Sequence, residues 1–272
     1  MYSERAVPGL GVIWRVEQPT EPAAPSSAAP SDFSPSVSTI VPADGCADFV
    51  LRGDALLIAG PSTQWLRSPV DSATPTVGIR FAPGTAAAAF GRPLDALRDS
   101  LVPADVAIAG AVALRVASSM RALASGTRQD ATELMREREF VPSLAHAIDA
   151  DGGVSTAPVP WRRAALQAAD AEDSLSALAH RIGFSERQVH RKMLAEFGYG
   201  FAALRRVRRG LRARLALDNG ASLAQVAVRA GYADQSHFTR EFSRMMGETP
   251  SQYARLRQVV APSDAGAAGS GA

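Results

Sequence analysis

Two stretches of the sequence lie 48 residues apart and repeat one pattern: SLSALAHRIGF at residues 174–184 and SLAQVAVRAGY at residues 222–232. Ser, Leu, a further aliphatic residue, Ala, Gly and an aromatic residue occupy the same offsets in both copies. A second helical pattern follows each aromatic residue and ends at Gly198 or Gly247. Two helices joined by a short glycine-containing turn, occurring twice, are typical of paired helix-turn-helix units. The sequence therefore predicts a DNA-binding regulator.

The distribution of charge divides the chain into two parts. Residues 161–260 carry 17 Lys and Arg against 9 Asp and Glu, a net charge of +8, whereas the remaining residues carry 12 against 18, a net charge of −6. A basic C-terminal module beside an acidic N-terminal one indicates that the C-terminal part alone meets a polyanion. Lys192 is the only lysine. Arginine suits bidentate contacts, but a compositional bias explains the excess of arginine equally well.

Other features of the composition exclude several classes of protein. No apolar run approaches the about 20 residues that a membrane span needs, and the first ten residues lack the apolar core of a signal peptide. Cys46 is the single cysteine, so an internal disulfide or a multi-thiolate metal site is excluded. No Walker loop, GxSxG or HExxH motif occurs. We expect a cytoplasmic protein that is not an enzyme, spans no membrane and needs no cofactor.

We predict an α+β chain with two domains. Residues 1–150 form a mainly β sensor or dimerisation domain, a small sandwich or barrel with a helical C-terminal part. Residues 151–160 are a linker, 161–258 an all-α domain of two helix-turn-helix units joined by a long helix, and 259–272 a disordered tail. Short apolar runs bounded by turn residues predict strands at Gly11–Val16, Val37–Val41, Ala47–Arg52, Ala55–Ala59, Gln64–Leu66 and Thr76–Phe81.

Helical spacing begins after Gly84. It predicts a short helix at Thr85–Phe90, and apolar residues continue at helical spacing through Leu94, Leu97 and Leu101 and then from Val112 to Leu123. A further helix is expected at about 131–148. Two interpretations of these helices stay open: they pack on the core of the domain, or they form a surface for dimerisation.

The C-terminal domain is predicted in more detail. Helices are expected at Trp161–Ala169, Leu175–Ile182, 186–197, Phe201–Leu217, from 223 on, 235–246 and from Pro250 on. Ser185 and Ser222 are in position to cap helices, and either Asp173 or Ser174 caps the helix that starts at Leu175. Val189 and Met193 face inward in the first unit, and Phe238 and Phe242 in the second.

The residues from Leu223 to Arg255 resemble the C-terminal domain of the AraC/XylS family of transcription regulators. The residues that carry the resemblance are Val226-Ala227, Gly231-Tyr232, Asp234 to Phe238, Arg240, Phe242, Gly247, Thr249-Pro250 and Tyr253. The first copy is similar through Ser185 to Gln188 and Arg191, but it has Met193 where the family usually has phenylalanine. Gly210 within the long helix is also unusual, because glycine costs about 1 kcal/mol in helix propensity.

The resemblance implies that both recognition helices enter successive major-groove segments, about 34 Å apart on one face of the duplex. Carried over by position, the candidates for base contacts are Arg187, His190 and Arg191 in the first copy and Gln235, Ser236, His237 and Arg240 in the second. Arginine can bond guanine O6 and N7 together, and Ser or Gln can bond base edges or phosphates. The alternative for each residue is a solvated side chain or a phosphate contact.

The N-terminal half has a weaker likeness to the uncharacterised N-terminal domain of one AraC-like subgroup, carried by residues 42–48 and 78–84. The family implies a cupin-like barrel that binds a small-molecule effector or dimerises. Asp44 and Asp48 are candidates for holding a cationic group, and Arg80 for an anionic one. A simple Asp-Gly turn and an internal ion pair of Arg80 are the alternatives. The first 145 residues contain no histidine, which excludes a histidine-based metal site there.

Two further classes of protein are alternatives to a regulator. An interaction protein with a DNA-binding-like fold and no sensing is opposed by the +8 charge on the repeat. An alkyl-transfer repair relative needs a cluster of thiolates, which one cysteine cannot supply. A redox switch at Cys46 is disfavoured because no basic residue adjoins it in sequence. RNA polymerase, an effector and a second copy of the chain stay open as partners beside double-stranded DNA.

Overall fold

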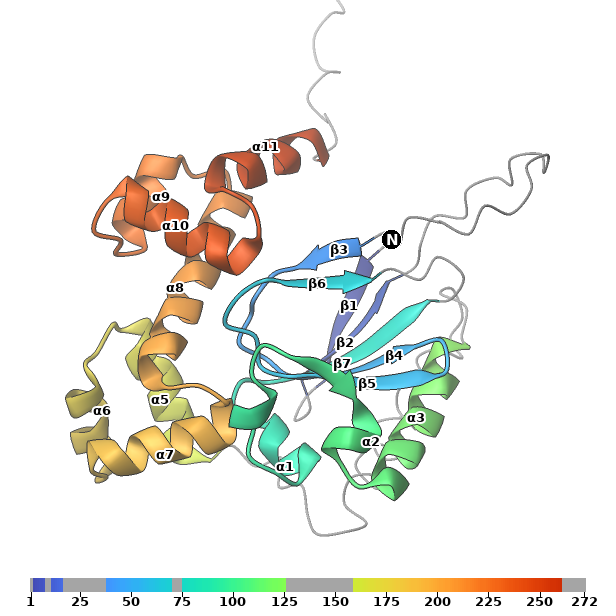
Figure 1. The fold of residues 1–272 in the computed structure, drawn as a ribbon. Helices are drawn as coiled ribbons and strands as arrows, with labels where there is room; N and C mark the ends of the chain where they lie inside the picture. Colours follow the sequence, from blue (N-terminus) through green and yellow to red (C-terminus); the bar gives the residue numbers. More distant parts are fainter. Residues whose placement is uncertain (1, 8–10, 17–37, 70–74, 126–158, 261–272) are drawn as a thin grey trace, which may run out of the picture.

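The computed structural model describes residues 2–7, 11–16, 38–69, 75–125 and 159–260. A β-rich N-terminal region is followed by an all-helical C-terminal domain, which confirms the predicted order of the two parts (Figure 1). The helix expected at 131–148, the linker residues 151–158 and the tail residues 261–272 lie outside the described residues. None of the helices within the described ranges combines the length and the apolar character that a membrane crossing requires.

Two antiparallel sheets form the N-terminal region. The larger one has the strand order β1-β2-β7-β4-β5-β8, and the smaller one pairs β3 with β6. In chain order the strands are β1 (Tyr2–Val7), β2 (Gly11–Val16), β3 (Ser38–Val41), β4 (Asp48–Arg52), β5 (Ala55–Ala59), β6 (Leu66–Pro69), β7 (Thr76–Phe81) and β8 (Leu101–Pro103). Strands β2, β5 and β7 have the predicted bounds, and β3 and β4 begin one residue later than expected.

The two faces of the larger sheet have different environments. Because successive side chains of a strand point to opposite faces, Phe49 and Leu51 of β4 enter the hydrophobic core, whereas Asp48, Val50 and Arg52 line a cavity. Helices α1 (Ala86–Phe90), α2 (Ala104–Ala107) and α3 (Gly110–Ala124) pack on the core face. Strands β3 and β6 border the cavity on the other face. This alternation separates a packed side from a side that is open to a ligand.

Three N-terminal predictions need correction. Leu101 lies on edge strand β8 rather than on a helix, and Asp95–Leu97 is a single 3-10 turn. The strand expected at Gln64–Leu66 is β6, which begins at Leu66. Strand β1 was not predicted. By contrast, Phe90 ends α1 before Gly91, and α3 covers the helical pattern from Val112 to Leu123, so both helices are confirmed.

Between residues 159 and 260, which the structure describes, the C-terminal domain has seven helices: α5 (Pro160–Asp170), α6 (Leu175–Ile182), α7 (Glu186–Phe197), α8 (Phe201–Asp218), α9 (Leu223–Arg229), α10 (Gln235–Met246) and α11 (Pro250–Val260). The pair α6–α7 and the pair α9–α10 lie at opposite ends of the long helix α8 (Figure 1). This arrangement confirms two helix-turn-helix units joined by one connecting helix.

Each unit has its own hydrophobic core. Val189, Met193 and Phe197 of α7 are buried with Leu178 in the first, and Phe238 and Phe242 of α10 are buried with Val226 in the second. Met193 is fully buried, so methionine fills the place of the usual phenylalanine.

The buried Gly210 of α8 faces α10. A Cβ atom added at this position would lie 2.2 Å from the Sδ of Met245. The close approach of Met245 therefore accounts for a glycine inside a helix.

Candidate DNA-binding interface

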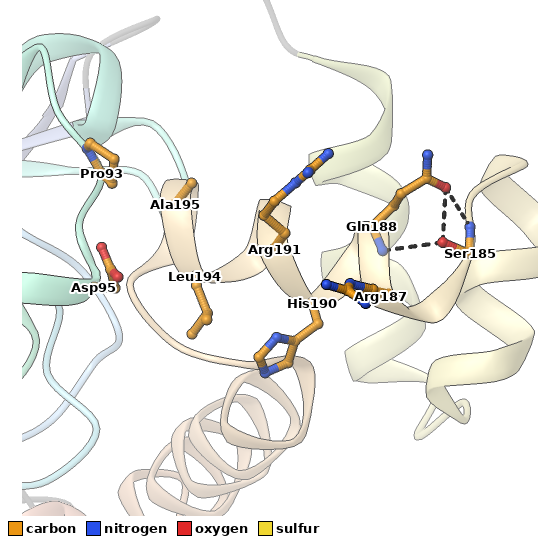
Figure 2. Close-up of a pocket in the computed structure, with 9 residues that line it drawn as sticks. All are labelled: Pro93, Asp95, Ser185, Arg187, Gln188, His190, Arg191, Leu194 and Ala195. Atoms are coloured by element: carbon orange, nitrogen blue, oxygen red, sulfur yellow. Dashed lines mark hydrogen bonds between the residues drawn. The ribbon is translucent and has the colours of Figure 1, made fainter.

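The first recognition helix, α7, begins with a complete capping box. The Ser185 hydroxyl accepts a hydrogen bond from the Gln188 backbone N–H at 3.3 Å, and the Gln188 side chain accepts one from the Ser185 N–H at 2.8 Å. These bonds satisfy donors that an uncapped helix would leave without partners. With Val189 buried, Arg187, His190 and Arg191 are left exposed on α7 (Figure 2). The three predicted residues of the first copy therefore lie together on one accessible surface.

The second recognition helix, α10, begins at an aspartate cap. The Asp234 carboxylate accepts a hydrogen bond from the His237 N–H at 2.6 Å. Gln235, Ser236 and Arg240 are exposed, as predicted. His237 is half-buried, its ring meets Tyr232 edge to face at 5.4 Å, and its Nδ1 accepts a 3.4 Å hydrogen bond from Ala233. Unlike the exposed candidates on α10, the His237 side chain therefore already contacts other residues of the protein.

A shallow groove of about 530 Å³ runs along α7. One wall is the recognition helix, from Ser185 through Arg187, His190 and Arg191 to Ala195. The other wall consists of Pro93 and Asp95 of the N-terminal region (Figure 2). No pattern in the sequence places these two residues beside a recognition helix.

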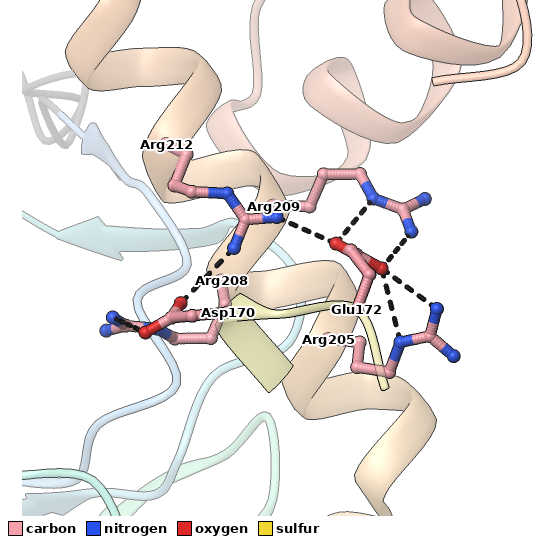
Figure 3. Close-up of polar contacts among 6 residues, drawn as sticks. All are labelled: Asp170, Glu172, Arg205, Arg208, Arg209 and Arg212. Carbon is pink, nitrogen blue, oxygen red and sulfur yellow. Dashed lines mark hydrogen bonds and ion pairs between the residues drawn. The ribbon is translucent and has the colours of Figure 1, made fainter. Parts of the chain in front are cut away.

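Four arginines of α8 are held by two carboxylates, that of Asp170 at the end of α5 and that of Glu172 in the turn that follows (Figure 3). Glu172 receives hydrogen bonds from Arg205, Arg209 and Arg212, and Asp170 from Arg208 and Arg212. We call these six residues the arginine clip. Much of the positive charge on the connecting helix is therefore neutralised within the domain, which the total charge of residues 161–260 does not reveal.

The arginine clip changes the pKa of Glu172. Partial burial by itself would raise the pKa, but the hydrogen bonds from Arg209, Arg205 and Arg212 outweigh it and lower the pKa to about 2. The backbone of Glu172 has a φ of +58°, a conformation that most residues avoid. A strained residue kept ionised against three guanidinium groups fixes the turn after α5 to the connecting helix.

The N-terminal region also holds the C-terminal ends of both recognition helices. The Leu94 N–H donates to the Ala195 carbonyl of α7 at 2.9 Å, and the Ala43 N–H donates to the Met245 carbonyl of α10 at 2.8 Å. Carbonyls in the last turn of a helix have no partner within that helix. The N-terminal region supplies hydrogen-bond donors to these otherwise unpaired carbonyls, so its position is coupled to both recognition helices.

The three predicted effector residues lie together in the structure. Arg80 Nε is 2.8 Å from Asp44 Oδ2 and 3.4 Å from Asp48 Oδ2. The Trp14 indole donates to Asp48 at 2.8 Å, and Asp44 accepts a 2.8 Å bond from the Cys46 N–H within the turn. The internal ion pair and the Asp-Gly turn, which the sequence left as alternatives, are both present.

The same three residues line a cavity of about 780 Å³ that reaches the C-terminal domain. Besides the sheet and strands β3 and β6, its walls include Arg214 and Asp218 of α8 and Arg257 of α11. Burial raises the pKa of Asp48 to about 7; the charge of Arg80 opposes this shift and that of Asp44 adds to it. The cavity therefore combines apolar walls with ionisable groups from both domains.

Cys46 lies beside this site and has the environment of a structural thiol. Burial raises the pKa of Cys46 well above its usual value, and the charges of Asp44 and Asp48 raise it further. A low thiolate fraction disfavours oxidation chemistry.

Residues 178–256 match the family model described as a helix-turn-helix domain. The C-terminal domain is an AraC-type helix-turn-helix domain. Residues 14–103 match a second family model, described as a domain of unknown function (DUF6597), which fits the likeness of the N-terminal half to an uncharacterised domain.

Two curated relatives and one solved structure are among the proteins to which the chain is similar. VirS of Mycobacterium tuberculosis, an HTH-type transcriptional regulator, is 31% identical over 127 residues, which are 47% of this chain and 34% of VirS. NphR of a Rhodococcus species, a transcriptional activator, is 36% identical over 86 residues, which are 32% of this chain and 26% of NphR. The chain thus aligns with about a third or less of these relatives. The structure of ToxT from Vibrio cholerae has a TM-score of 0.47 at 11% identity, covering 94% of this chain and 98% of that one.

Proposed function

We propose that the protein is a sequence-specific DNA-binding transcription regulator whose AraC-type domain reads two successive major-groove segments. The observation that carries the proposal is the pair of capped recognition helices on one connecting helix, each with exposed polar and cationic side chains. A major groove about 12 Å wide admits one helix. Helix α8, braced by the arginine clip, holds the two helices at a fixed separation.

The candidate side chains fall into three groups. Arg187, Arg191 and Arg240 are proposed to contact guanine edges, because a guanidinium bonds O6 and N7 together. Gln235 and Ser236 contact base edges or phosphates. His190 and His237 complete the candidate set, and His237 must leave Tyr232 before it reaches a base.

We expect Arg240→Ala to lose discrimination at one base pair of the site, at a cost of about 1–3 kcal/mol. The guanidinium that distinguishes guanine at this position is absent from the variant, so the ranking of the four bases there should flatten. A duplex selected from a random pool, together with its single-base variants, would be titrated against the full-length protein by fluorescence anisotropy at several salt concentrations.

Arg229→Ala is the matched control. Arg229 is an exposed arginine on the support helix α9, so its removal changes the net charge equally without touching α10. Equal weakening on all duplexes by Arg240→Ala would assign Arg240 to a phosphate. Weak binding that neither prefers any sequence nor falls with salt would contradict the proposed function.

We further propose that the 780 Å³ cavity is an effector site with Asp44, Asp48 and Arg80 in its wall. Its size falls in the range of small-molecule pockets, and its lining mixes apolar surface with a few polar groups. Because the walls of the cavity come from both domains, a ligand there contacts α8, the helix that connects the two helix-turn-helix units. Whichever domain moves, occupancy then changes the coupling between them.

A ligand at this site should raise the melting temperature of the protein. A ligand that binds only the folded state stabilises that state by about 2.7 kcal/mol when its concentration is 100 times Kd. Thr76→Trp, on β7 in the cavity wall, should abolish the shift because the larger side chain fills the space. A panel of metabolites would be screened by thermal denaturation on both proteins. If no compound shifts the wild type, or if each active compound shifts the variant equally, the effector proposal is wrong.

A further inference from the structure

The N-terminal region contributes a wall to the groove along the first recognition helix. Pro93 and Asp95 line this groove opposite Arg187, His190 and Arg191 (Figure 2). Asp95 is the one carboxylate among the residues that line it. A DNA segment that reaches the exposed side chains of α7 therefore meets a residue from outside the helix-turn-helix domain.

The wall is fixed to α7 rather than resting loosely on it. Leu94, between the two wall residues, is buried and bonds the Ala195 carbonyl through its N–H at 2.9 Å. Close packing surrounds this bond, since a Cβ atom added at Gly198 would lie 3.0 Å from the Leu94 carbonyl oxygen, and one added at Gly84 would lie 2.8 Å from the Phe197 ring. Contacts this close keep Asp95 at a constant place beside the recognition helix.

The carboxylate of Asp95 has no charge partner within the part of the chain that the structure describes. The side chain is exposed, and it forms no hydrogen bond or ion pair to any described residue, although two arginines line the same groove. Its negative charge is therefore not neutralised on the surface that the proposed function assigns to DNA.

We propose that the segment Pro93–Asp95 is part of the DNA interface and that Asp95 weakens the grip of the first recognition helix by facing the phosphate backbone. The inference rests on the proposed function. A recognition helix in the major groove has a phosphate strand on each side, so a wall beside the helix meets one of these strands. A carboxylate next to a phosphate is repelled, and the N-terminal region thereby offsets part of the attraction that Arg187 and Arg191 provide.

The test compares Asp95→Asn and Asp95→Arg in the full chain, with a selected duplex that contains both half-sites as the probe. Asp95→Asn should tighten binding about twofold to fivefold at low salt, the size expected for one exposed charge pair, and the gain should shrink as salt screens it. Asp95→Arg adds a phosphate contact, so the plot of log K against log salt should steepen by about 0.9.

Asp105→Asn is the matched control, because Asp105 is exposed on α2 and does not line the groove. Both Asn variants change the net charge equally. An equal gain in DNA affinity from each would mean that only the overall charge matters, and it would overturn the inference. Unchanged binding by Asp95→Asn, with specific binding by the wild type, would overturn the inference and leave the proposed function standing. If the wild type itself binds no DNA specifically, both fall, and the wild-type titration alone shows it.

Discussion

Glu172→Gln is expected to lower the free energy of unfolding by about 1–3 kcal/mol, because one carboxylate holds three arginines of the connecting helix. The amide keeps the shape of the side chain but removes the charge, and the guanidinium groups then repel one another without a counterion. The side chain is partly solvated, so the estimate lies below that for a fully buried ion pair. Urea denaturation at neutral pH, followed by circular dichroism, measures the effect.

The effect of Glu172→Gln should depend on pH in a defined direction. The pKa of Glu172 is lowered to about 2 in the folded protein from an ordinary value of 4.5. The carboxylate therefore contributes stability that is fully present above about pH 4.5 and is lost as the pH falls towards 2. The difference between wild type and variant should be large at pH 6 and small near pH 2.5.

Glu248→Gln provides the comparison for the arginine clip. Glu248 is half-buried and makes no hydrogen bond or ion pair to the described residues, so its substitution should change stability by less than about 0.5 kcal/mol. If both variants lost the same stability, or if the loss for Glu172→Gln were equal at both pH values, the arginine clip would not be the source of the effect.

The helix-turn-helix units could be predicted because their signals are local. Caps such as Ser185 act over three residues, and the inward positions, such as Phe238 and Phe242, recur every four residues along one helix. The structure also settles one open choice, because Ser174, not Asp173, caps α6. Exposure of six of the seven candidate residues, all but His237, followed from the same periodicity, since a side chain opposite a buried stripe points outward.

The N-terminal errors arise where the local signal is ambiguous. Leu94, Leu97 and Leu101 have the spacing of a helix, but Leu94 caps a 3-10 turn that ends at Leu97, and Leu101 lies on a three-residue edge strand. Short apolar runs do not distinguish these states. Strand β1 carries Glu4 and Arg5 within six residues at the edge of the sheet, where charged residues are common, so its composition did not stand out.

Contacts between distant segments could not be predicted at all. The arginine clip joins residues more than 30 positions apart, and the hydrogen bond from the Tyr199 hydroxyl to the Gly45 carbonyl joins residues 154 positions apart. Backbone acceptors such as Gly45 carry no sequence signal, and the place of Asp95 beside α7 depends on how the two domains dock. The sequence therefore yielded the candidate base-contact residues but not the residues that position them.

Gly45→Ala is expected to destabilise the protein by about 2–4 kcal/mol through the contact between the domains. Gly45 has a φ of +73°, and an added Cβ would lie 2.4 Å from the Oη of Tyr199, a fully buried side chain that cannot move aside. The substitution thus adds backbone strain to a steric clash. Chemical denaturation gives the loss in stability, and two separate thermal transitions in place of one would report that the domains have come apart.

Three further variants separate backbone strain from steric clash. Gly91→Ala is the control for strain, because Gly91 has a φ of +63° with no atom within 4 Å of an added Cβ, so it should cost only about 1 kcal/mol. Tyr199→Phe alone should cost about 1–3 kcal/mol, since the buried Gly45 carbonyl loses its donor. The double variant Gly45→Ala/Tyr199→Phe should then be less destabilised than the sum of the two single changes, by about 1 kcal/mol or more, because removing Oη relieves the clash. Additivity of the two changes would mean that Tyr199 is not what resists a side chain at position 45, and that this contact does not hold the domains together.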